Sequence, residues 1–176
     1  MNHRGSYNHR VSTEQHRKTA PASVRCYVIT ISDTRTESND TSGDAIAGLL
    51  ETSGHAVSGR VLVKDDPAAV RAAVVKGAAA GAQVIITTGG TGVTSRDSTY
   101  ETLASMLDKT LDGFGELFRM LSFQEIGAAA MLTRACAGSI GRTAVFSLPG
   151  SEHAVRLAMS KLIVPEIGHV VRELNR

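Results

Sequence analysis

The sequence predicts an α/β domain with three layers, in which helices cover both faces of a mostly parallel central sheet. Short β-prone apolar runs alternate with amphipathic helical stretches, which is the order typical of parallel strands joined by helices. The chain has 176 residues, 42% hydrophobic and 20% charged, so it is long enough to bury a sizeable core. A glycine-rich loop directly after the third apolar run predicts a ligand site at the carboxyl ends of the strands.

The amino-terminal part differs from the rest in charge and composition. Residues 1–22 are polar and basic, and we expect a flexible leader there, followed by one folded domain over 23–176. Five basic residues against one acid within 1–25 give this part +4, which leaves −2 of the formal net charge of +2 for the remainder. A mildly acidic body lacks the basic stripe of nucleic-acid-binding proteins. The leader is either a solvated tail or a contact for an anionic partner.

Targeting signals and disulfide patterns are missing from the sequence. No apolar run approaches the roughly 18 residues of a membrane span, and no apolar signal-peptide region precedes the domain. Cys26 and Cys136 lack metal-ligand spacing. We therefore expect a cytoplasmic protein with no membrane partner.

The first elements follow from local patterns. The β-prone run Cys26–Ile31 predicts a central strand. A polar loop over 32–40 precedes a helix over 42–52, whose apolar residues share one face and which Gly54 ends. Alternating residues over 57–63 predict the second strand.

The next elements surround the glycine-rich loop. Asp66 and Pro67 predict a helix start, with the acid at the N-cap and proline in the first turn, and glycines at 77–81 predict its end. The apolar run 83–86 predicts the third strand. After the loop, the spacing of Ser98-Thr99-Tyr100-Glu101 predicts a capping box that opens a helix reaching Leu107.

Three further elements complete the domain. Apolar residues at i, i+3, i+4 and i+7 within 114–121 predict an amphipathic helix that faces the core or another subunit. The run 144–148 predicts a buried strand, and a helix follows that Pro165 interrupts or restarts.

Polar side chains and glycines follow each predicted strand, so they should gather at one edge of the sheet. Backbone N–H groups in the loop Thr87 to Asp97 can hold a phosphate, and its glycines allow close approach of a ligand. Up to three carboxylates near this edge are suited to a magnesium ion that bridges phosphates. The last strand contributes to this edge only if it runs parallel to the others.

Each of these residues also has a structural interpretation. The glycines are compatible with an ordinary tight turn, and Asp65 with either a metal ligand or a turn. Asp66, Ser42 and Ser151 are expected helix caps, and Glu101 completes the capping box. Asp33 and Asp40 are expected to organise their loop.

Several nucleotide and hydrolase motifs are absent. The chain has no G-x-x-x-x-G-K-[ST] sequence, and its Gly90-x-Gly92 lacks the third glycine of a dinucleotide site. It also has no G-x-S-x-G elbow.

One motif, T-x-G-G-T-G-x-T-x-R-D at Thr87 to Asp97, resembles the molybdopterin-binding MogA/MoaB family of molybdenum-cofactor biosynthesis. The resemblance extends from about Arg25 to Leu174, and residues 113–126 are more similar to the MoaB branch than to the MogA branch. The other matching blocks are Asp40-Thr41-Ser42-Gly43, Val63-Lys64-Asp65-Asp66, Gly113-Phe114-Gly115-Glu116, Met131-Leu132-Thr133-Arg134-Ala135 and Pro149-Gly150-Ser151.

The resemblance implies a three-layer domain in a homotrimer, or in a hexamer of two trimers. It implies adenylyl transfer from MgATP to molybdopterin with release of pyrophosphate, and possible contacts with other proteins of the pathway. The family's two essential acids correspond to Asp65 and Asp97, which would hold Mg²⁺. Its substrate-binding residues correspond to Ser42, Gly43, Gly89, Gly90, Thr91, Gly92, Pro149, Gly150 and Ser151, and Arg96 would add a charged phosphate contact.

A second function remains open at this point. Some MoaB-like proteins are thought to lack the activity, so the alternative is a non-catalytic molybdopterin-binding or scaffold oligomer of the same pathway. The presence of Asp65, Asp97 and Arg96 favours the enzyme.

Overall fold

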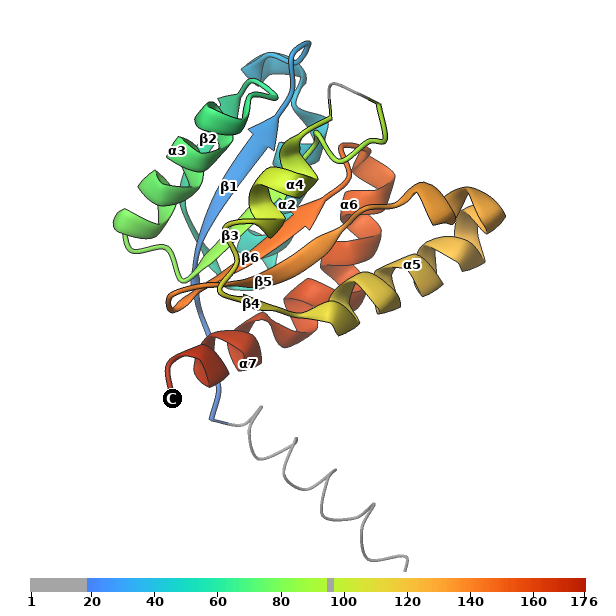
Figure 1. Ribbon diagram of the computed structural model, residues 1–176. Helices are drawn as coiled ribbons and strands as arrows, with labels where there is room; N and C mark the ends of the chain where they lie inside the picture. Colours follow the sequence, from blue (N-terminus) through green and yellow to red (C-terminus); the bar gives the residue numbers. More distant parts are fainter. Residues whose placement is uncertain (1–18, 95–96) are drawn as a thin grey trace, which may run out of the picture.

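The computed structural model describes residues 19–94 and 97–176, in which helices lie on both faces of one six-stranded sheet (Figure 1). The strand order is β2-β1-β3-β6-β5-β4. The strands are β1 (Arg25–Ile31), β2 (Ala56–Val63), β3 (Val84–Thr88), β4 (Lys109–Thr110), β5 (Cys136–Ile140) and β6 (Thr143–Leu148). The helical segments are η1 (Glu37–Asn39), α2 (Thr41–Thr52), α3 (Pro67–Ala79), α4 (Thr99–Ala104), α5 (Asp112–Ile126), η2 (Gly127–Leu132), α6 (Glu152–Ala158), η3 (Met159–Ile163) and α7 (Val164–Leu174).

Strands β2, β1, β3 and β6 are parallel, which confirms the mostly parallel sheet and the expected direction of the late strand. Strand β5 runs antiparallel to β6, and β4 runs antiparallel to β5. The sequence analysis did not predict β4 or β5. Strand β5 has the sequence CAGSI, whose small residues give little strand propensity, so pairing with β6 decides its conformation.

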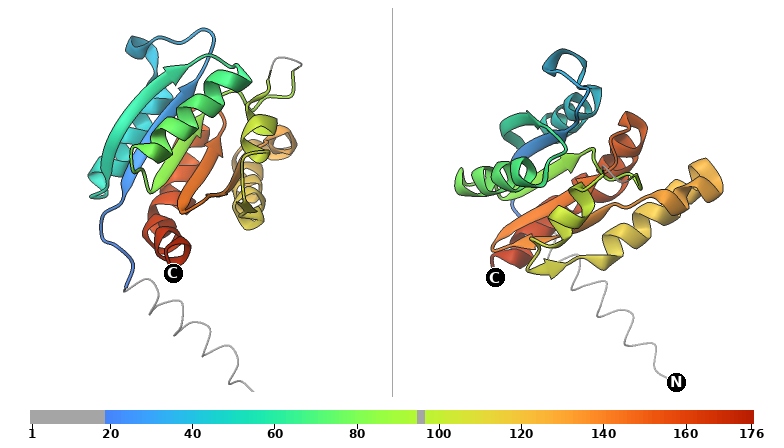
Figure 2. Two further views of the ribbon diagram at one scale, coloured as in Figure 1. Left: turned by 60° about the vertical axis from the view of Figure 1, so that its left-hand side comes forward. Right: turned by 45° about the horizontal axis from the view of Figure 1, so that its top comes forward.

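The two faces of the sheet carry different helices, as the views in Figure 2 show. Helices α3 and α4 cover the face that includes Ile29, Ile85 and Val145. Helices α2, α5, α6 and α7 cover the other face, where Val28 and Ile86 are buried. This arrangement confirms the three-layer α/β/α fold.

Helix boundaries agree with the sequence at most positions. Asp66 caps α3 by accepting a hydrogen bond from the Ala69 N–H at 2.8 Å, and Ser151 caps α6 through the Ala154 N–H at 3.3 Å. Pro165 lies in the first turn of α7, directly after the π-helical segment η3, so the proline restarts the helix.

Two expected caps are wrong. Asp40, rather than Ser42, is the N-cap of α2 and accepts a hydrogen bond from the Gly43 N–H at 3.0 Å. Ser98 makes no capping hydrogen bond at the start of α4. The Ser98 hydroxyl instead donates to Asp65 at 3.4 Å, and the Ser42 hydroxyl donates to the N-cap carboxylate of Asp40 at 3.4 Å.

The start of the folded domain is visible in the described part of the leader. Val24 is buried, and the Pro21 carbonyl lies so close to Gly168 of α7 that a Cβ there would approach it to 2.7 Å. The rest of the predicted leader, residues 1–18, lies outside the described residues. Among those described, no helix combines the length and the apolar character needed to cross a membrane.

Candidate functional site

The carboxyl ends of four parallel strands form one edge of the sheet. The loops that follow β1, β2, β3 and β6 therefore emerge side by side at this edge. Because β5 runs in the opposite direction, it begins at the same edge, and residues just before Cys136 reach it as well. Segments from widely separated parts of the sequence thus contribute to one site.

The glycine loop after β3 passes directly over the end of β1. Gly89 and Gly90 have φ angles of +105° and +64°, which side chains rarely adopt. A Cβ on Gly89 would overlap the Ile31 carbonyl oxygen, so glycine is required for the close approach. The Gly89 N–H donates to the Leu148 carbonyl at 3.1 Å, and the Thr99 N–H donates to the Gly90 carbonyl at 3.2 Å.

The remaining amides of this loop are available to a ligand. The N–H groups of Gly90, Thr91 and Gly92 have no hydrogen-bond partner within the described ranges. Consecutive unpaired amides next to a helix start are the geometry that proteins use to hold phosphate oxygens.

Asp65 lies against this loop from the β2 side. Its Oδ1 accepts hydrogen bonds from the Thr99 hydroxyl at 3.0 Å and the Ser98 hydroxyl at 3.4 Å. A Cβ on Gly90 would come within 2.7 Å of Asp65 Oδ2, so this carboxylate faces the loop directly. The Ser98 hydroxyl bonds Asp65 and makes no capping hydrogen bond to the backbone of α4, so the expected capping box does not form.

Asp97 lies at the other end of the loop, beside Gly92. Its Oδ2 accepts hydrogen bonds from the Thr94 hydroxyl at 2.6 Å and the Thr94 N–H at 2.8 Å. These hydrogen bonds hold the pKa of the Asp97 carboxyl below its usual range, because they favour the ionised form. The two acids therefore contact the same loop at positions two residues apart.

Arg134 is a site residue for which the sequence analysis derived no role. Its Nε donates to the Thr91 carbonyl at 3.2 Å, and its guanidinium carbon lies 5.0 Å from the centre of the Tyr100 ring. Both terminal nitrogens of Arg134 donate to Glu101, and this pairing lowers the pKa of the Glu101 carboxyl. Glu101 therefore binds Arg134 instead of completing a capping box, and Arg134 ties the glycine loop to α4.

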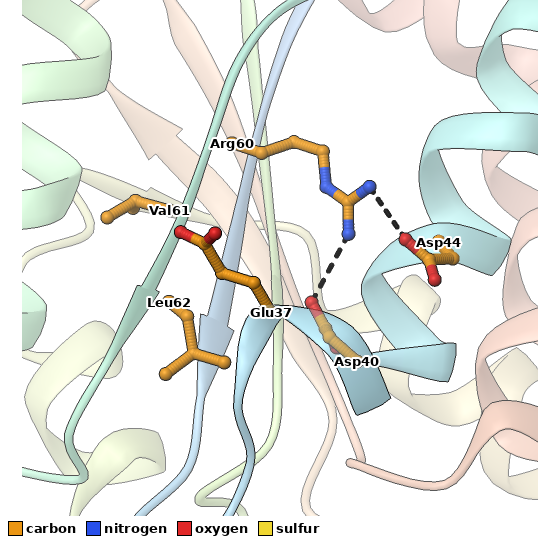
Figure 3. A pocket seen from close by; sticks show the side chains of 6 residues that line it. All are labelled: Glu37, Asp40, Asp44, Arg60, Val61 and Leu62. Atoms are coloured by element: carbon orange, nitrogen blue, oxygen red, sulfur yellow. Dashed lines mark hydrogen bonds and ion pairs between the residues drawn. The ribbon is translucent and has the colours of Figure 1, made fainter.

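The loop after β1 contains a buried carboxylate that holds the start of α2. Asp40 accepts hydrogen bonds from the Thr30 hydroxyl at 2.6 Å and from Arg60 at 3.3 Å, and Arg60 also pairs with Asp44 at 2.8 Å (Figure 3). A Cβ on Gly43 would overlap Asp40, so glycine is required there. The expectation that Asp40 organises its loop is confirmed.

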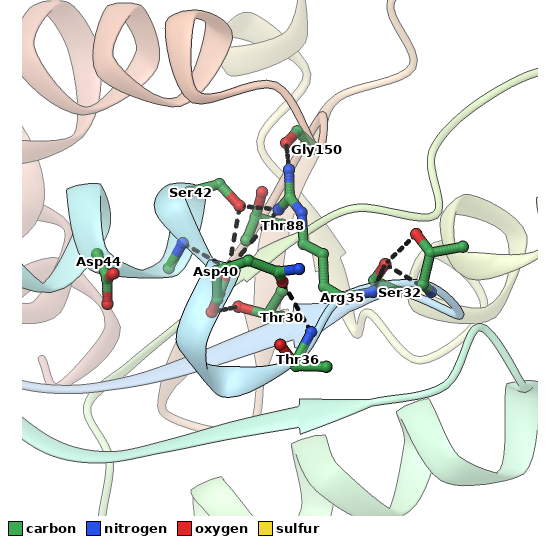
Figure 4. Close-up of polar contacts among 12 residues, drawn as sticks. Thr30, Ser32, Arg35, Thr36, Asp40, Ser42, Asp44, Thr88 and Gly150 are labelled. Carbon is green, nitrogen blue, oxygen red and sulfur yellow. Dashed lines mark hydrogen bonds and ion pairs between the residues drawn. The ribbon is translucent and has the colours of Figure 1, made fainter.

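Ser42 and Gly43 are both buried, and the Ser42 hydroxyl and the Gly43 N–H are occupied. The Ser42 hydroxyl accepts a hydrogen bond from Arg35 and donates to Asp40 at 3.4 Å, while the Gly43 N–H serves the cap (Figure 4). This corner of the edge therefore presents Arg35 to solvent, rather than the amides of α2.

The turn after β6 is joined to the glycine loop. The Pro149 carbonyl accepts a hydrogen bond from the Thr88 hydroxyl at 2.9 Å. A Cβ on Gly150 would lie 3.3 Å from the Gly89 Cα, so the two backbones are in contact. The predicted turn Pro149 to Ser151 thus lies beside the glycine loop. Arg96, which was also predicted as a site residue, lies outside the described residues.

Asp65 and Asp97 each lie beside a glycine of the loop, Asp65 at Gly90 and Asp97 at Gly92. Within 19–94 and 97–176, no group of three or more His, Cys, Asp or Glu side chains is arranged to hold a metal ion. Two of the predicted carboxylates, Asp65 and Asp97, lie against the glycine loop, which is within the predicted limit of three. Asp33 holds the start of the next loop, because its Oδ1 accepts a hydrogen bond from the Asp65 N–H at 3.3 Å.

Comparison with known proteins shows which family has this arrangement of loops. A family model described as a probable molybdopterin binding domain matches residues 27–169. The chain belongs to this family. The match includes the glycine loop, both acids and the turn after β6, and it confirms the resemblance seen in the sequence.

Relatives and solved structures agree with this assignment. The chain is 52% identical over 168 residues to molybdenum cofactor biosynthesis protein B of Bacillus cereus, covering 94% of this chain and 99% of the relative. A crystal structure of a molybdenum cofactor biosynthesis protein B superposes with a TM-score of 0.87 at 53% identity, covering 90% of this chain and 99% of that one. The tungsten cofactor synthesizing protein MoaB from Pyrococcus furiosus has a TM-score of 0.80 at 39% identity, covering 89% and 100%.

Proposed function

We propose that this protein acts in cytoplasmic molybdenum cofactor biosynthesis as a molybdopterin adenylyltransferase. Molybdopterin and ATP would give adenylylated molybdopterin and pyrophosphate. The observation that carries the proposal is the glycine loop, whose unpaired amides at Gly90 to Gly92 lie between the carboxylates of Asp65 and Asp97. Membership of the molybdopterin-binding family, with relatives named for molybdenum cofactor biosynthesis, supports the pathway.

The proposed reaction is an in-line displacement at phosphorus. An oxygen of the pterin's terminal phosphate forms a bond to the α-phosphorus of ATP, and the bond from that phosphorus to the bridging β-phosphate oxygen breaks. The electron pair leaves with pyrophosphate. In such a reaction the protein mainly positions the reactants and stabilises the developing charge. The amides of the glycine loop would hold a phosphate, with Arg96 and the turn Pro149 to Ser151 as further predicted contacts.

The two acids fit a magnesium ion. Asp65 Oδ2 and Asp97 Oδ1 accept no hydrogen bond from the described residues, so each carboxylate keeps one oxygen for a cation. Mg²⁺ prefers one or two carboxylates together with phosphate oxygens and water, and a pair of acids meets that preference. When bound, Mg²⁺ would neutralise the charge that develops on the leaving phosphate oxygens.

We further propose that the protein assembles as a homotrimer or a hexamer. Large apolar side chains remain exposed along α5 and η2, and such a surface is typical of a subunit interface. Sedimentation should give a mass that is three or six times 18.5 kDa. The exposed side chains are Leu117, Met120, Phe123, Ile126, Met131 and Leu132.

The decisive experiment is incubation of the pure protein with molybdopterin and labelled MgATP, followed by analysis for adenylylated pterin. Asp97→Asn should lower turnover by about 10²–10³-fold, the effect typical of one lost electrostatic contact, with little loss of stability. Asp112→Asn is the matched control, because Asp112 is exposed on α5 and should leave turnover unchanged.

The same materials test the non-catalytic alternative. An enzyme should bind MgATP, and chelation of magnesium should weaken that binding. A scaffold protein would bind molybdopterin, ignore MgATP and yield no adenylylated product, and that result would overturn the proposed activity. Wild-type turnover in Asp97→Asn would remove Asp97 from the mechanism.

A further inference from the structure

We propose that Arg35 binds a phosphate group at the same edge of the sheet and orients it beside the glycine loop. This inference rests on the proposed function, and it adds a charged binding residue that the family motifs do not include. Arg35 lies in the loop between β1 and η1, and its side chain is 25% exposed.

The guanidinium of Arg35 is fixed by contacts from two separate segments. One terminal nitrogen donates to the Ser42 hydroxyl at the start of α2, and the other donates to the Gly150 carbonyl at 2.7 Å (Figure 4). The Arg35 backbone N–H also donates to the Ser32 hydroxyl at 3.1 Å, which holds the loop itself. A group fixed in this way loses little conformational entropy when it binds a ligand.

Arg35 keeps hydrogen-bond donors that no neighbour uses. A guanidinium has five N–H groups, and the contacts to Ser42 and Gly150 take two of them. Within the described residues, the other three have no acceptor. Free guanidinium donors in a fixed plane match the oxygens of a phosphate.

The positive charge of Arg35 is also incompletely neutralised. Its nearest carboxylate is Asp40, at 3.6 Å, which is longer than a hydrogen bond. Asp40 is already paired with Arg60 at 3.3 Å (Figure 3). It also accepts hydrogen bonds from the Thr30 hydroxyl and the Gly43 N–H. The charge of Asp40 is therefore shared, and Arg35 retains attraction for an anion.

The position of Arg35 directs that anion towards the glycine loop. Its acceptor Gly150 is in backbone contact with Gly89, and Thr88 holds the same turn through the Pro149 carbonyl. The guanidinium is thus anchored to the turn that contacts Gly89, the residue just before the unpaired amides of the loop. Ser42 and Gly43 are buried beneath it, so they support Arg35 and Arg35 makes the contact with the ligand.

Isothermal titration calorimetry with inorganic tripolyphosphate and with inorganic phosphate tests this inference, because neither probe requires the transfer reaction. We expect Arg35→Ala to weaken binding by roughly 10- to 100-fold, the range for one hydrogen-bonded charge, and Arg35→Lys to recover part of the affinity. A larger loss for tripolyphosphate assigns the contact to ATP, and a larger loss for phosphate assigns it to the pterin phosphate. Arg71→Ala is the matched control, since Arg71 bonds Ser105 on another surface.

Thermal unfolding of the same variants separates binding from support of the fold. Weaker binding in Arg35→Ala at an unchanged Tm, with partial rescue in Arg35→Lys, supports the inference. Equal affinity of wild type and Arg35→Ala for both probes overturns it, whether that affinity is high or absent. If no adenylylated pterin forms while the Arg35-dependent binding persists, the proposed activity fails and the phosphate contact stands.

Discussion

Replacement of Gly90 by alanine tests how the glycine loop and Asp65 depend on each other. Gly90 has a φ of +64°, and an added Cβ would overlap the Thr99 hydroxyl and lie 2.7 Å from Asp65 Oδ2. The left-handed conformation costs an alanine about 1–2 kcal/mol. Displacement of packed neighbours adds about 1–3 kcal/mol. We therefore expect Gly90→Ala to lower the free energy of unfolding by about 2–5 kcal/mol.

Two other glycines separate these contributions. Gly54 has a φ of +82° but open space around its Cα, so Gly54→Ala should cost only the backbone contribution of about 1–2 kcal/mol. Gly48 lies within α2 with open space and no positive φ, so Gly48→Ala should stabilise the protein by about 0.5–1 kcal/mol. One substitution is thus expected to have three different effects according to its surroundings.

The assay is urea unfolding at one protein concentration, because any subunit assembly makes stability concentration-dependent. Turnover is measured alongside, and only Gly90→Ala should reduce it, since only this variant displaces Asp65. If Gly90→Ala costs no more than Gly54→Ala, the contact with Thr99 and Asp65 is not as tight as the structure shows. That result would refute the reasoning.

The remaining predictions concern the two ends of the loop. Thr94→Val removes one donor to Asp97, so the Asp97 pKa, measured by carbon NMR, should rise towards its ordinary value of 3.8 while the backbone hydrogen bond remains. Because the folded-state pKa is lowered, the stabilisation from these bonds is complete above pH 3.8 and is lost as the pH falls through the lowered pKa. An Asp97 pKa that is the same in Thr94→Val as in the wild type would contradict this prediction. Arg134→Ala removes the bond to the Thr91 carbonyl, so hydrogen exchange of the bonded Gly89 and Thr94 amides should accelerate while exchange in α3 stays unchanged. Equal exchange in wild type and variant would show that Arg134 does not hold the loop.

Local patterns were sufficient for most of the scaffold. Strands β1, β3 and β6 are mostly apolar runs, β2 alternates, and the start of α3 combines an acid with a proline, so each pattern is readable within a few residues. Strands β4 and β5 were missed because their conformation depends on pairing, of β5 with β6 and of β4 with β5, which local propensity does not encode.

The site shows the same division between local and long-range causes. Asp65, Asp97 and the glycines were identified because they follow strands whose carboxyl ends must share an edge. Ser98 and Ser42 were assigned as caps by spacing, but each hydroxyl meets a carboxylate supplied by the site, Asp65 or Asp40. Asp65 lies 33 positions from Ser98, so a rule that counts sequence neighbours cannot include it. Asp40 is a sequence neighbour of Ser42, and α2 begins at Thr41, one residue earlier than predicted.

The sequence by itself determined the succession of parallel strands and helices along the chain, the glycine loop at the carboxyl edge of the strands and the presence of two acids beside it. Only the tertiary structure decided the roles of Arg35 and Arg134. Arg35 reaches the Gly150 carbonyl 115 positions away, and Arg134 reaches Thr91 because antiparallel β5 begins where the parallel strands end. An arginine's role is set by the acceptors and charges within reach of its long side chain, and folding alone brings those together.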